Sequence, residues 1–159
     1  MMDISFKTGF GRFNYRVCGV IMRNNSLLIM RDEQSPYAYL PGGRVKLHET
    51  TESALLRESQ EELHIQAKLL RALWFCQSFF TDAANGERYH EICIYYLVDI
   101  EHTSLAASPE RFSIPDNGHN HDFEWIPLDE LKNIDLVPEF IKEEILHLPE
   151  NPVMLTAYE

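Results

Sequence analysis

The stretch from Gly42 to Ile65, GGRVKLHETTESALLRESQEELHI, combines a glycine pair, an arginine and a run of glutamates. Glu58, Glu61 and Glu62 are three and four residues apart, so a helix would place their carboxylates on one face. Their mutual repulsion would destabilise that helix unless a cation lay between them. Oxygen ligands of this kind suit Mg²⁺ or Mn²⁺, often together with substrate phosphates. The stretch therefore predicts a metal site for phosphate chemistry.

An acidic, solvated helix face would explain the three glutamates alone, but the residues around them favour a site. Gly43 is followed after five residues by Glu49, after seven more by Arg57–Glu58, and then by Glu61–Glu62. This spacing resembles the Nudix box, whose defining glycine, glutamates and arginine stand at the same intervals. Seven of the nine defined positions match without a gap. The box covers residues 43–65.

Two positions of the box depart from the family pattern. Ser59 stands where an aliphatic residue is expected, and a buried hydroxyl without a partner costs roughly 1–3 kcal/mol. His64 stands where a glycine usually ends the helix in a left-handed conformation, which histidine tolerates better than most residues. Neither departure removes a carboxylate, so we expect them to affect stability and local geometry rather than chemistry.

The resemblance implies a fold and a reaction. The Nudix fold is α/β, an α/β/α sandwich with a mixed β-sheet, and we expect one such domain over residues 1–159. Its members hydrolyse a pyrophosphate bond in a nucleoside diphosphate linked to another group, with Mg²⁺ or Mn²⁺ as cofactor. The expected partner is thus a small nucleotide or diphosphate substrate, such as a nucleoside triphosphate, a nucleotide sugar or ADP-ribose. Family members are often homodimers, so a homodimer is expected by resemblance alone.

The subfamily cannot be assigned from the sequence. ADP-ribose enzymes often carry a proline downstream of the box, in the region where this chain has Phe80 and Thr81. Dinucleoside polyphosphate enzymes often carry a tyrosine slightly further on, where this chain has Asp82 and Ala83. Missing signatures weaken these assignments without excluding the substrates.

A nucleotide-sensing Nudix domain without catalysis is the alternative function. Such domains usually lose carboxylates of the box, whereas all four are present here: Glu49, Glu58, Glu61 and Glu62. An isomerase acting on an isoprenoid diphosphate would need additional cysteine and histidine positions that have no convincing counterparts. We therefore expect a hydrolase.

The family pattern assigns roles to the residues of the box. Glu61–Glu62 match the metal-ligating pair, and Glu58 matches a position that serves as ligand or general base. The carbonyl of Gly42 matches a backbone ligand. Arg57 is expected to pair with Glu49 and to hold the loop against the helix.

Four further residues are candidates outside these positions. Glu91, at the start of an expected strand, could be the additional acid that many members use as base or third-metal ligand; a solvated strand-edge glutamate is the alternative. Arg16, Arg31 and Arg44 could bind substrate phosphates, because guanidinium groups suit that geometry. The expected catalytic residues are thus Glu58, Glu61, Arg57 and Glu91, and the expected metal ligands are Gly42, Glu58, Glu61 and Glu62.

Charge and composition limit the classes of partner. The formal net charge is −11, from 25 acidic and 14 basic residues. A general nucleic-acid binder needs a basic surface, so we expect no nucleic-acid partner. No apolar run approaches the roughly 20 residues of a membrane span, and the first residues do not resemble a secretory signal. Cys18, Cys76 and Cys93 lie in apolar surroundings typical of reduced core cysteines, so we expect a cytoplasmic protein.

The hydrophobic pattern predicts the order of the elements. Strands are expected at 15–22, 27–30, 37–40, 69–80, 91–100 and 123–126, the first two joined as a hairpin. The helix of the box should have Thr50 as its N-cap and run to about Leu63. Further helices are expected near 128–133 and 138–148. The polar segment 101–122 is expected to be a long loop.

Overall fold

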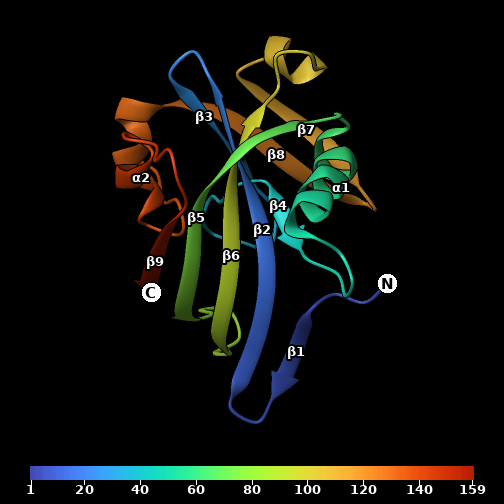
Figure 1. Ribbon diagram of the computed structural model, residues 1–159, viewed down its shortest axis with the longest axis vertical. Coiled ribbons are helices and arrows are strands. Elements are labelled where there is room, and N and C mark those ends of the chain that lie inside the picture. The colour runs from blue at the N-terminus through green and yellow to red at the C-terminus, as the bar shows by residue number, and fades with distance from the viewer.

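The computed structural model describes residues 1–159, the whole of the sequence. Nine strands and a few helical segments make up the fold (Figure 1). The strands are β1 (Ser5–Thr8), β2 (Gly11–Arg23), β3 (Ser26–Arg31), β4 (Gly42–Arg44), β5 (Lys68–Thr81), β6 (Arg88–Asp99), β7 (Arg111–Asp116), β8 (His119–Pro127) and β9 (Val153–Tyr158). The helices are α1 (Thr51–Leu63) and α2 (Ile141–Glu144), with two 3₁₀ segments, η1 (Ser104–Ala107) and η2 (Leu128–Asn133).

The strands form one mixed sheet. Seven of them follow the order β7-β8-β3-β2-β6-β5-β9, while β1 and β4 pair with β2 beside this path. Strand β2 runs parallel to β6 and β5 runs parallel to β9, whereas the other pairs are antiparallel. The expected α/β fold with a mixed sheet is therefore confirmed.

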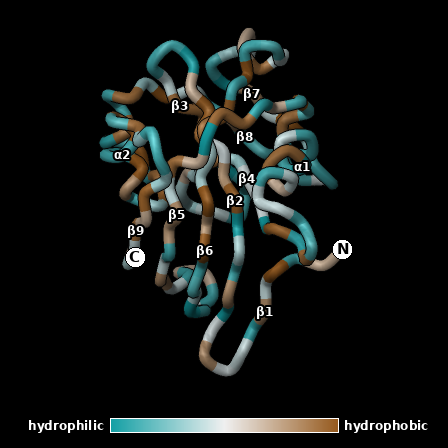
Figure 2. Tube along the Cα trace, viewed as in Figure 1, coloured by the Kyte–Doolittle hydropathy of each residue, from teal (hydrophilic) through white to brown (hydrophobic).

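Helical segments cover parts of both faces of the sheet. Val17 and Cys18 are adjacent on β2, so their side chains point to opposite faces. Val17 belongs to a core that includes Leu55 of α1, and Cys18 belongs to a second core that includes Ile141 of α2. Accordingly, α1 and α2 flank the sheet on opposite sides in Figure 1, and hydrophobic residues follow the strands between them in Figure 2.

The box helix begins and ends where the sequence predicts. The Thr50 side chain accepts a hydrogen bond from the backbone N–H of Ser53 at 3.1 Å, which caps the first turn. His64 ends α1 in the left-handed conformation at φ 55°, and its N–H donates to the carbonyl of Gln60 at 3.2 Å. Histidine thus takes the role of the family's glycine. Ser59 is buried, as expected for a position that is usually aliphatic.

The prediction of a long loop at 101–122 is wrong for most of that segment. Strands β7 and β8 form an antiparallel hairpin there, and Asn117 and Gly118 make its turn with φ angles of 47° and 83°. An Asn-Gly pair between alternating residues is a strong hairpin signal, because both turn positions need positive φ. Phe112 and Ile114 alternate with polar residues and pack against the core beneath α1. This local alternation stabilises strands in a segment whose composition is mostly polar.

Other boundaries also differ from the prediction. Residues 37–40 form only isolated bridges, between Tyr39 and Met30 and between Ala38 and Leu136. Within the predicted helix at 138–148, only α2 at Ile141–Glu144 is α-helical. The predicted helix at 128–133 is the 3₁₀ segment η2. Strands β1, β4 and β9 were not expected either. No helix has the length and apolar character that would let it cross a membrane.

Candidate active site

The glycine pair lets the box helix and the sheet approach closely. Gly42 lies opposite Cys18 in the pairing of β4 with β2. A β-carbon on Gly42 would lie 2.1 Å from the carbonyl oxygen of Val17, so only glycine fits. In this position the N–H of Gly42 donates to Oε2 of Glu62 at 3.1 Å. Gly42 and Glu62, two of the predicted metal ligands, are therefore in direct contact.

Arg57 organises the carboxylates of the box. Its Nε and Nη2 donate to the two carboxylate oxygens of Glu49 at 2.8 and 3.0 Å, a bidentate pair. Nη1 donates to Glu58 at 2.7 Å and to Glu61 at 3.3 Å, and Nη2 also donates to the carbonyl of Arg44 at 3.0 Å. The predicted pairing of Arg57 with Glu49 is present, and Arg57 holds the loop after β4 against α1.

Two of the box carboxylates are poorly solvated and lie near each other. Burial raises the pKa of Glu58, against the lowering effect of Arg57. Burial, and then the negative charge of Glu58, raise the pKa of Glu62 well above its ordinary range, while Arg16 opposes the rise. Only the N–H of Gly42 donates a hydrogen bond to Glu62. Burial and mutual repulsion thus oppose the ionisation of Glu62, a cost that a cation bound between the two carboxylates would remove.

The donor set fits a hard divalent cation. Carboxylate oxygens and a backbone carbonyl are the ligands that Mg²⁺ and Mn²⁺ prefer. In the structure no three Asp, Glu, His or Cys side chains yet converge on one point. Glu58 and Glu61 instead share the Arg57 guanidinium, and the Glu61 side chain is 56% exposed. The repulsion expected among the three glutamates is therefore relieved in part by Arg57.

Two of the three predicted phosphate-binding arginines lie together beside this site. Arg16 on β2 lies opposite Arg44 on β4, so their side chains project on the same side of the sheet. Arg44 makes only a long contact of 3.8 Å with Asp3, and its side chain is 41% exposed. Arg16 takes part in none of the ion pairs of the protein. Both guanidinium groups can therefore receive an anionic ligand.

Arg31 is held away from the other two arginines. Its Nη1 donates to Oε2 of Glu124 at 2.8 Å, and the other oxygen of that carboxylate accepts from Nε of Arg111 at 3.0 Å. These residues come from β3, β7 and β8. The structure does not bring Arg31 into contact with the box residues.

Glu91 faces the same side of the sheet as Arg16. Asn14 and Arg16 on β2 lie opposite Glu91 and Cys93 on the parallel strand β6. The Nδ2 of Asn14 donates to Oε2 of Glu91 at 3.3 Å, and the Oγ of Ser5 donates to Oδ1 of Asn14 at 2.6 Å. Because Ser5 occupies the amide oxygen, the amide nitrogen of Asn14 is directed at Glu91.

Sequence reasoning missed two residues next to this site. Asn14 is only 5% exposed, and its position between Phe13 and Tyr15, just before the predicted strand at 15–22, was the available signal. Tyr39 donates its hydroxyl hydrogen to the Asp32 carboxylate, and burial followed by this bond raises its pKa. The charges of Glu62 and Arg16 also act on the Tyr39 hydroxyl, which places this tyrosine at the edge of the site.

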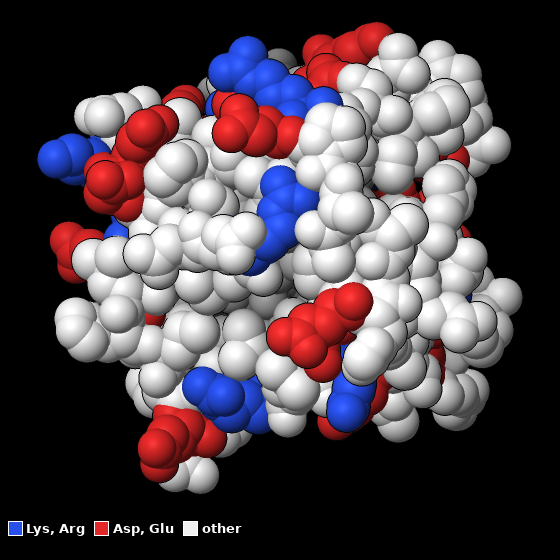
Figure 3. All heavy atoms as spheres, turned by 90° about the horizontal axis from the view of Figure 1, so that it is seen from above, with Lys and Arg blue, Asp and Glu red and all other residues white.

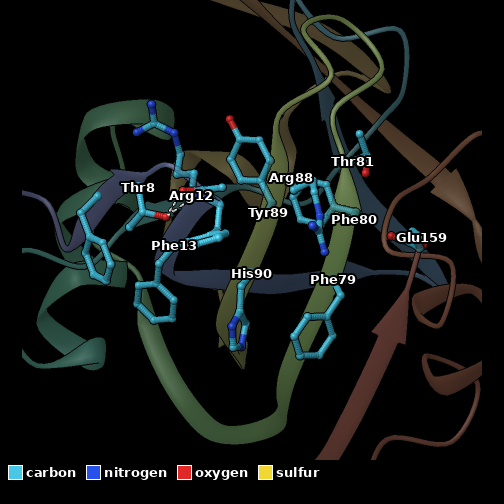
Figure 4. A pocket seen from close by; sticks show the side chains of 13 residues that line it. Thr8, Arg12, Phe13, Phe79, Phe80, Thr81, Arg88, Tyr89, His90 and Glu159 are labelled. Atoms are coloured by element: carbon cyan, nitrogen blue, oxygen red, sulfur yellow. Dashed lines mark hydrogen bonds between the residues drawn. The ribbon is translucent and has the colours of Figure 1, made fainter.

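An open pocket of about 620 Å³ lies elsewhere, at the far ends of β1, β2, β5 and β6 (Figure 4). Aromatic side chains, Arg12 and Arg88 line it, but none of the residues predicted for catalysis or metal binding does so. The pocket is therefore separate from the box.

Comparison with known proteins places the chain in a family. The profile of the NUDIX domain matches residues 13–147, most of the sequence. An ADP-ribose pyrophosphatase from Methanocaldococcus jannaschii is 29% identical over 97 residues, which cover 59% of this chain and 55% of that protein. The chain thus matches only about half the length of this relative.

Solved structures show the same fold. A mutator MutT protein from Bacillus halodurans has a TM-score of 0.62 at 13% identity, with 91% of this chain and 89% of the other covered. A MutT Nudix hydrolase from Burkholderia pseudomallei has a TM-score of 0.50 at 26% identity, with 74% and 84% covered. The matched profile, the mixed sheet and the spacing of the box agree, and this chain belongs to the Nudix family.

Proposed function

We propose that this chain is a divalent-cation-dependent pyrophosphohydrolase acting on a nucleoside diphosphate linked to another group. The observation that carries the proposal is the contact of the poorly solvated Glu62 carboxylate with Gly42, beside Glu58 and with Arg16 and Arg44 paired on the neighbouring strands. Glu58, Glu61, Glu62 and the Gly42 carbonyl would hold Mg²⁺ or Mn²⁺. When bound, such a cation neutralises diphosphate charge and acidifies the attacking water.

We assign the remaining residues to phosphate binding, proton transfer and positioning. Arg16 and Arg44 bind the phosphate oxygens from the sheet side. The oxygen of a water molecule attacks phosphorus, the bond from phosphorus to the bridging oxygen breaks, and that oxygen leaves with the departing phosphate. A carboxylate, Glu91 or Glu58, accepts the proton of the water. Arg57 keeps Glu58 and Glu49 in position for this step.

The site supports an enzyme over a nucleotide sensor without catalysis. All four box carboxylates are present, and Arg57 binds three of them, Glu49, Glu58 and Glu61, while Glu62 contacts the glycine pair. The M. jannaschii relative named as an ADP-ribose pyrophosphatase supports a pyrophosphate bond as the target. We therefore place ADP-ribose first among the substrates to test, followed by nucleoside triphosphates and nucleotide sugars.

We also propose a cytoplasmic location. Cys18, Cys76 and Cys93 are all buried and none forms a disulfide. Free buried thiols are typical of proteins in a reducing compartment.

Phosphate release from this panel, measured with and without Mg²⁺ or Mn²⁺, tests the proposed function. We expect metal-dependent turnover of one substrate class and a loss of at least about a hundredfold in Glu62→Gln, comparable with the removal of other strong electrostatic groups. Glu52→Gln, at an exposed position in the first turn of the same helix, is the matched control and should retain activity. Mn²⁺ binding should weaken in Glu62→Gln but not in the control.

Two outcomes would contradict these assignments. Binding of a nucleotide without turnover across the panel would favour the sensor. Near-normal turnover by Glu62→Gln at saturating Mg²⁺ would show that this carboxylate is not an obligatory ligand.

A further inference from the structure

One face of β2, β6 and β5 changes its chemistry in steps with distance from the box. Residues opposite each other in the strand register share a face of the sheet, and so do residues two positions apart on one strand. From the box outward, this face carries Arg16, Asn14 and Arg12 on β2, Cys93, Glu91 and Tyr89 on β6, and Cys76, Ser78 and Phe80 on β5. A guanidinium group beside buried thiols is thus followed by polar groups and then by an aromatic pair.

The aromatic pair at the end of this face, Phe80 and Tyr89, belongs to neither core. The two residues lie opposite each other on β5 and β6, and their rings stack with centroids 4.9 Å apart and planes at 4°. Both side chains are half-buried, and both line the open pocket of about 620 Å³. Pockets of roughly 300–1,000 Å³ are typical of small-molecule sites. A parallel stack beside such a space can be extended by a further flat ring.

A polar row separates the aromatic pair from the arginines of the proposed site. Ser78, Glu91 and Asn14 lie side by side on β5, β6 and β2. Ser78 and Asn14 are 4% and 5% exposed, whereas Glu91 is only half-buried and can meet a ligand. With a rise of about 3.3 Å per residue, Tyr89 lies roughly 7 Å beyond Glu91 along β6. This separation suits a sugar ring placed between a phosphate at Arg16 and a flat ring at Tyr89.

The order of groups along this face matches the order of parts in a nucleotide. Guanidinium groups bind phosphate, polar side chains suit the hydroxyl groups of a ribose, and aromatic rings stack on a base. The chain carries a net charge of −11, and acidic and basic side chains are interspersed on the surface seen in Figure 3, without a basic expanse. A nucleic-acid strand needs such an expanse. A single nucleotide therefore suits this face better than an oligonucleotide.

We infer that Phe80 and Tyr89 bind the base of the substrate and select nucleotides over other diphosphates. The inference rests on the proposed function, because the phosphates held by Arg16 and Arg44 direct the nucleotide along this face. The base extends the stack of the two rings, and the ribose lies between this stack and Arg16. Since every base has a π-face, stacking tolerates different bases. The pair thus distinguishes a nucleotide from pyrophosphate rather than one base from another.

Titration calorimetry with ADP, GDP, CDP, UDP and inorganic pyrophosphate, all at one Mg²⁺ concentration, tests this subsite. In the wild type, we expect the nucleotides to bind more tightly than pyrophosphate. Tyr89→Leu and Phe80→Leu each keep an apolar side chain but remove a ring. Each should raise the dissociation constant of the nucleotides at least about fivefold, the lower end of what base–aromatic stacking contributes. The dissociation constant of pyrophosphate should stay the same, because it does not reach the rings.

Phe79→Leu is the matched control. Phe79 precedes Phe80 on β5, is also half-buried, and its ring lies 4.5 Å from that of His90. Figure 4 shows Tyr89 on the side of the sheet away from Phe79 and His90. The control therefore removes a comparable ring from the other face and should leave the binding of both kinds of ligand unchanged. An equal loss of nucleotide binding in Phe79→Leu would overturn the inference.

The measurements separate this inference from the proposed function. Nucleotide binding that depends on Tyr89 and Phe80, without turnover of any substrate in the panel, would uphold the subsite and contradict the proposed function. Turnover of a nucleotide substrate with the same KM in the wild type, Tyr89→Leu and Phe80→Leu would support the function and overturn the subsite. A wild-type protein that binds no nucleotide, or binds pyrophosphate as tightly as the nucleotides, would also overturn it.

Discussion

The carboxyl group of Glu58 occupies the space beside Gly43 in which any other residue would carry its side chain. A β-carbon on Gly43 would lie 2.2 Å from both Cδ and Oε1 of Glu58, far inside contact distance. The backbone of Gly43 does not require a positive φ, so the role of this glycine is to make room for the carboxylate. Strand β4 and helix α1 thus meet at the point where the carboxylate is needed.

Gly43→Ala should therefore impair activity more than stability. The end of the Glu58 side chain is flexible and can move aside, but it then leaves its place beside Gly43. We expect kcat/KM to fall about ten- to a hundredfold, as for other displacements of about 1 Å in an active site. The melting temperature should change little. Gly9→Ala, where a β-carbon meets nothing within 4 Å, is the control; equal kinetics in the two variants would refute the role of Gly43.

Arg57→Lys should weaken both the fold and the site. The Arg57 guanidinium donates to Glu49, Glu58, Glu61 and the carbonyl of Arg44, and a lysine ammonium cannot reproduce the bidentate pair. We expect the free energy of unfolding in urea to fall by about 1–3 kcal/mol because partly buried acceptors lose their donors. Turnover should fall with it, since Glu58 loses its anchor.

Arg111→Lys is the comparison for this change. Arg111 also pairs with a carboxylate, that of Glu124, but its side chain is 81% exposed. Exposed pairs contribute at most about 1 kcal/mol, so the loss should be small. Equal losses in the Arg57 and Arg111 variants would show that Arg57 is an ordinary surface pair.

Asn14 should act as a positioning residue through Glu91. Its amide nitrogen donates to Glu91, and Ser5 holds the amide in that orientation. If Glu91 takes part in the reaction, Asn14→Ala should lower kcat more than it raises KM. The double variant with Glu91→Gln should then be no slower than Glu91→Gln alone, because both changes remove one interaction. If the fold-losses in kcat of the two single variants multiply in the double variant, Asn14 and Glu91 act independently.

Glu87 should contribute to stability in a way that depends on pH. Its carboxylate pairs with Lys7 at 2.9 Å and with Arg12 at 3.2 Å, which joins the β5–β6 connection to β1 and β2. The hydrogen bond from Lys7, and then that from Arg12, lower the pKa of Glu87 below its ordinary value of 4.5. A lowered pKa in the folded state stabilises the protein above the unfolded-state pKa, and this contribution disappears as pH falls through the folded-state pKa.

Glu87→Gln should accordingly lower the melting temperature at pH 7 but not in strong acid. Melting curves of both proteins from pH 7 to pH 2 should converge as Glu87 of the wild type becomes protonated. A difference that stays constant over this range would mean that the charge of Glu87 does not act through its ion pairs.

Much of the box could be predicted because its structure depends on neighbours a few residues away. Thr50 caps α1, His64 ends it, and the pairing of Arg57 with Glu49 joins residues eight positions apart. The hairpin of β7 and β8 was also signalled locally, by Asn117 and Gly118, but the polar composition of the segment concealed it. These features follow from turn geometry and short-range hydrogen bonds.

The hydrogen-bond partners of Arg31 and Glu91, which lie outside the box, depend on the order of the strands in the sheet. Arg31, a candidate for phosphate binding, pairs with Glu124 of β8, 93 residues away in the chain. Glu91 gained a donor because β2 and β6 lie side by side in parallel, which brings Asn14 within 3.3 Å across 77 residues. No spacing within a single segment carries this information, because pairing between distant strands is set by the packing of the whole sheet.

The sequence by itself determined the family, the box helix with its caps, and the set of carboxylates that the chemistry requires. Only the tertiary structure decided which arginines accompany those carboxylates and how Asn14 directs Glu91. The physical reason is the reach of the interactions: helix spacing and capping act within one or two turns, whereas a sheet face gathers alternate residues from strands far apart in the chain.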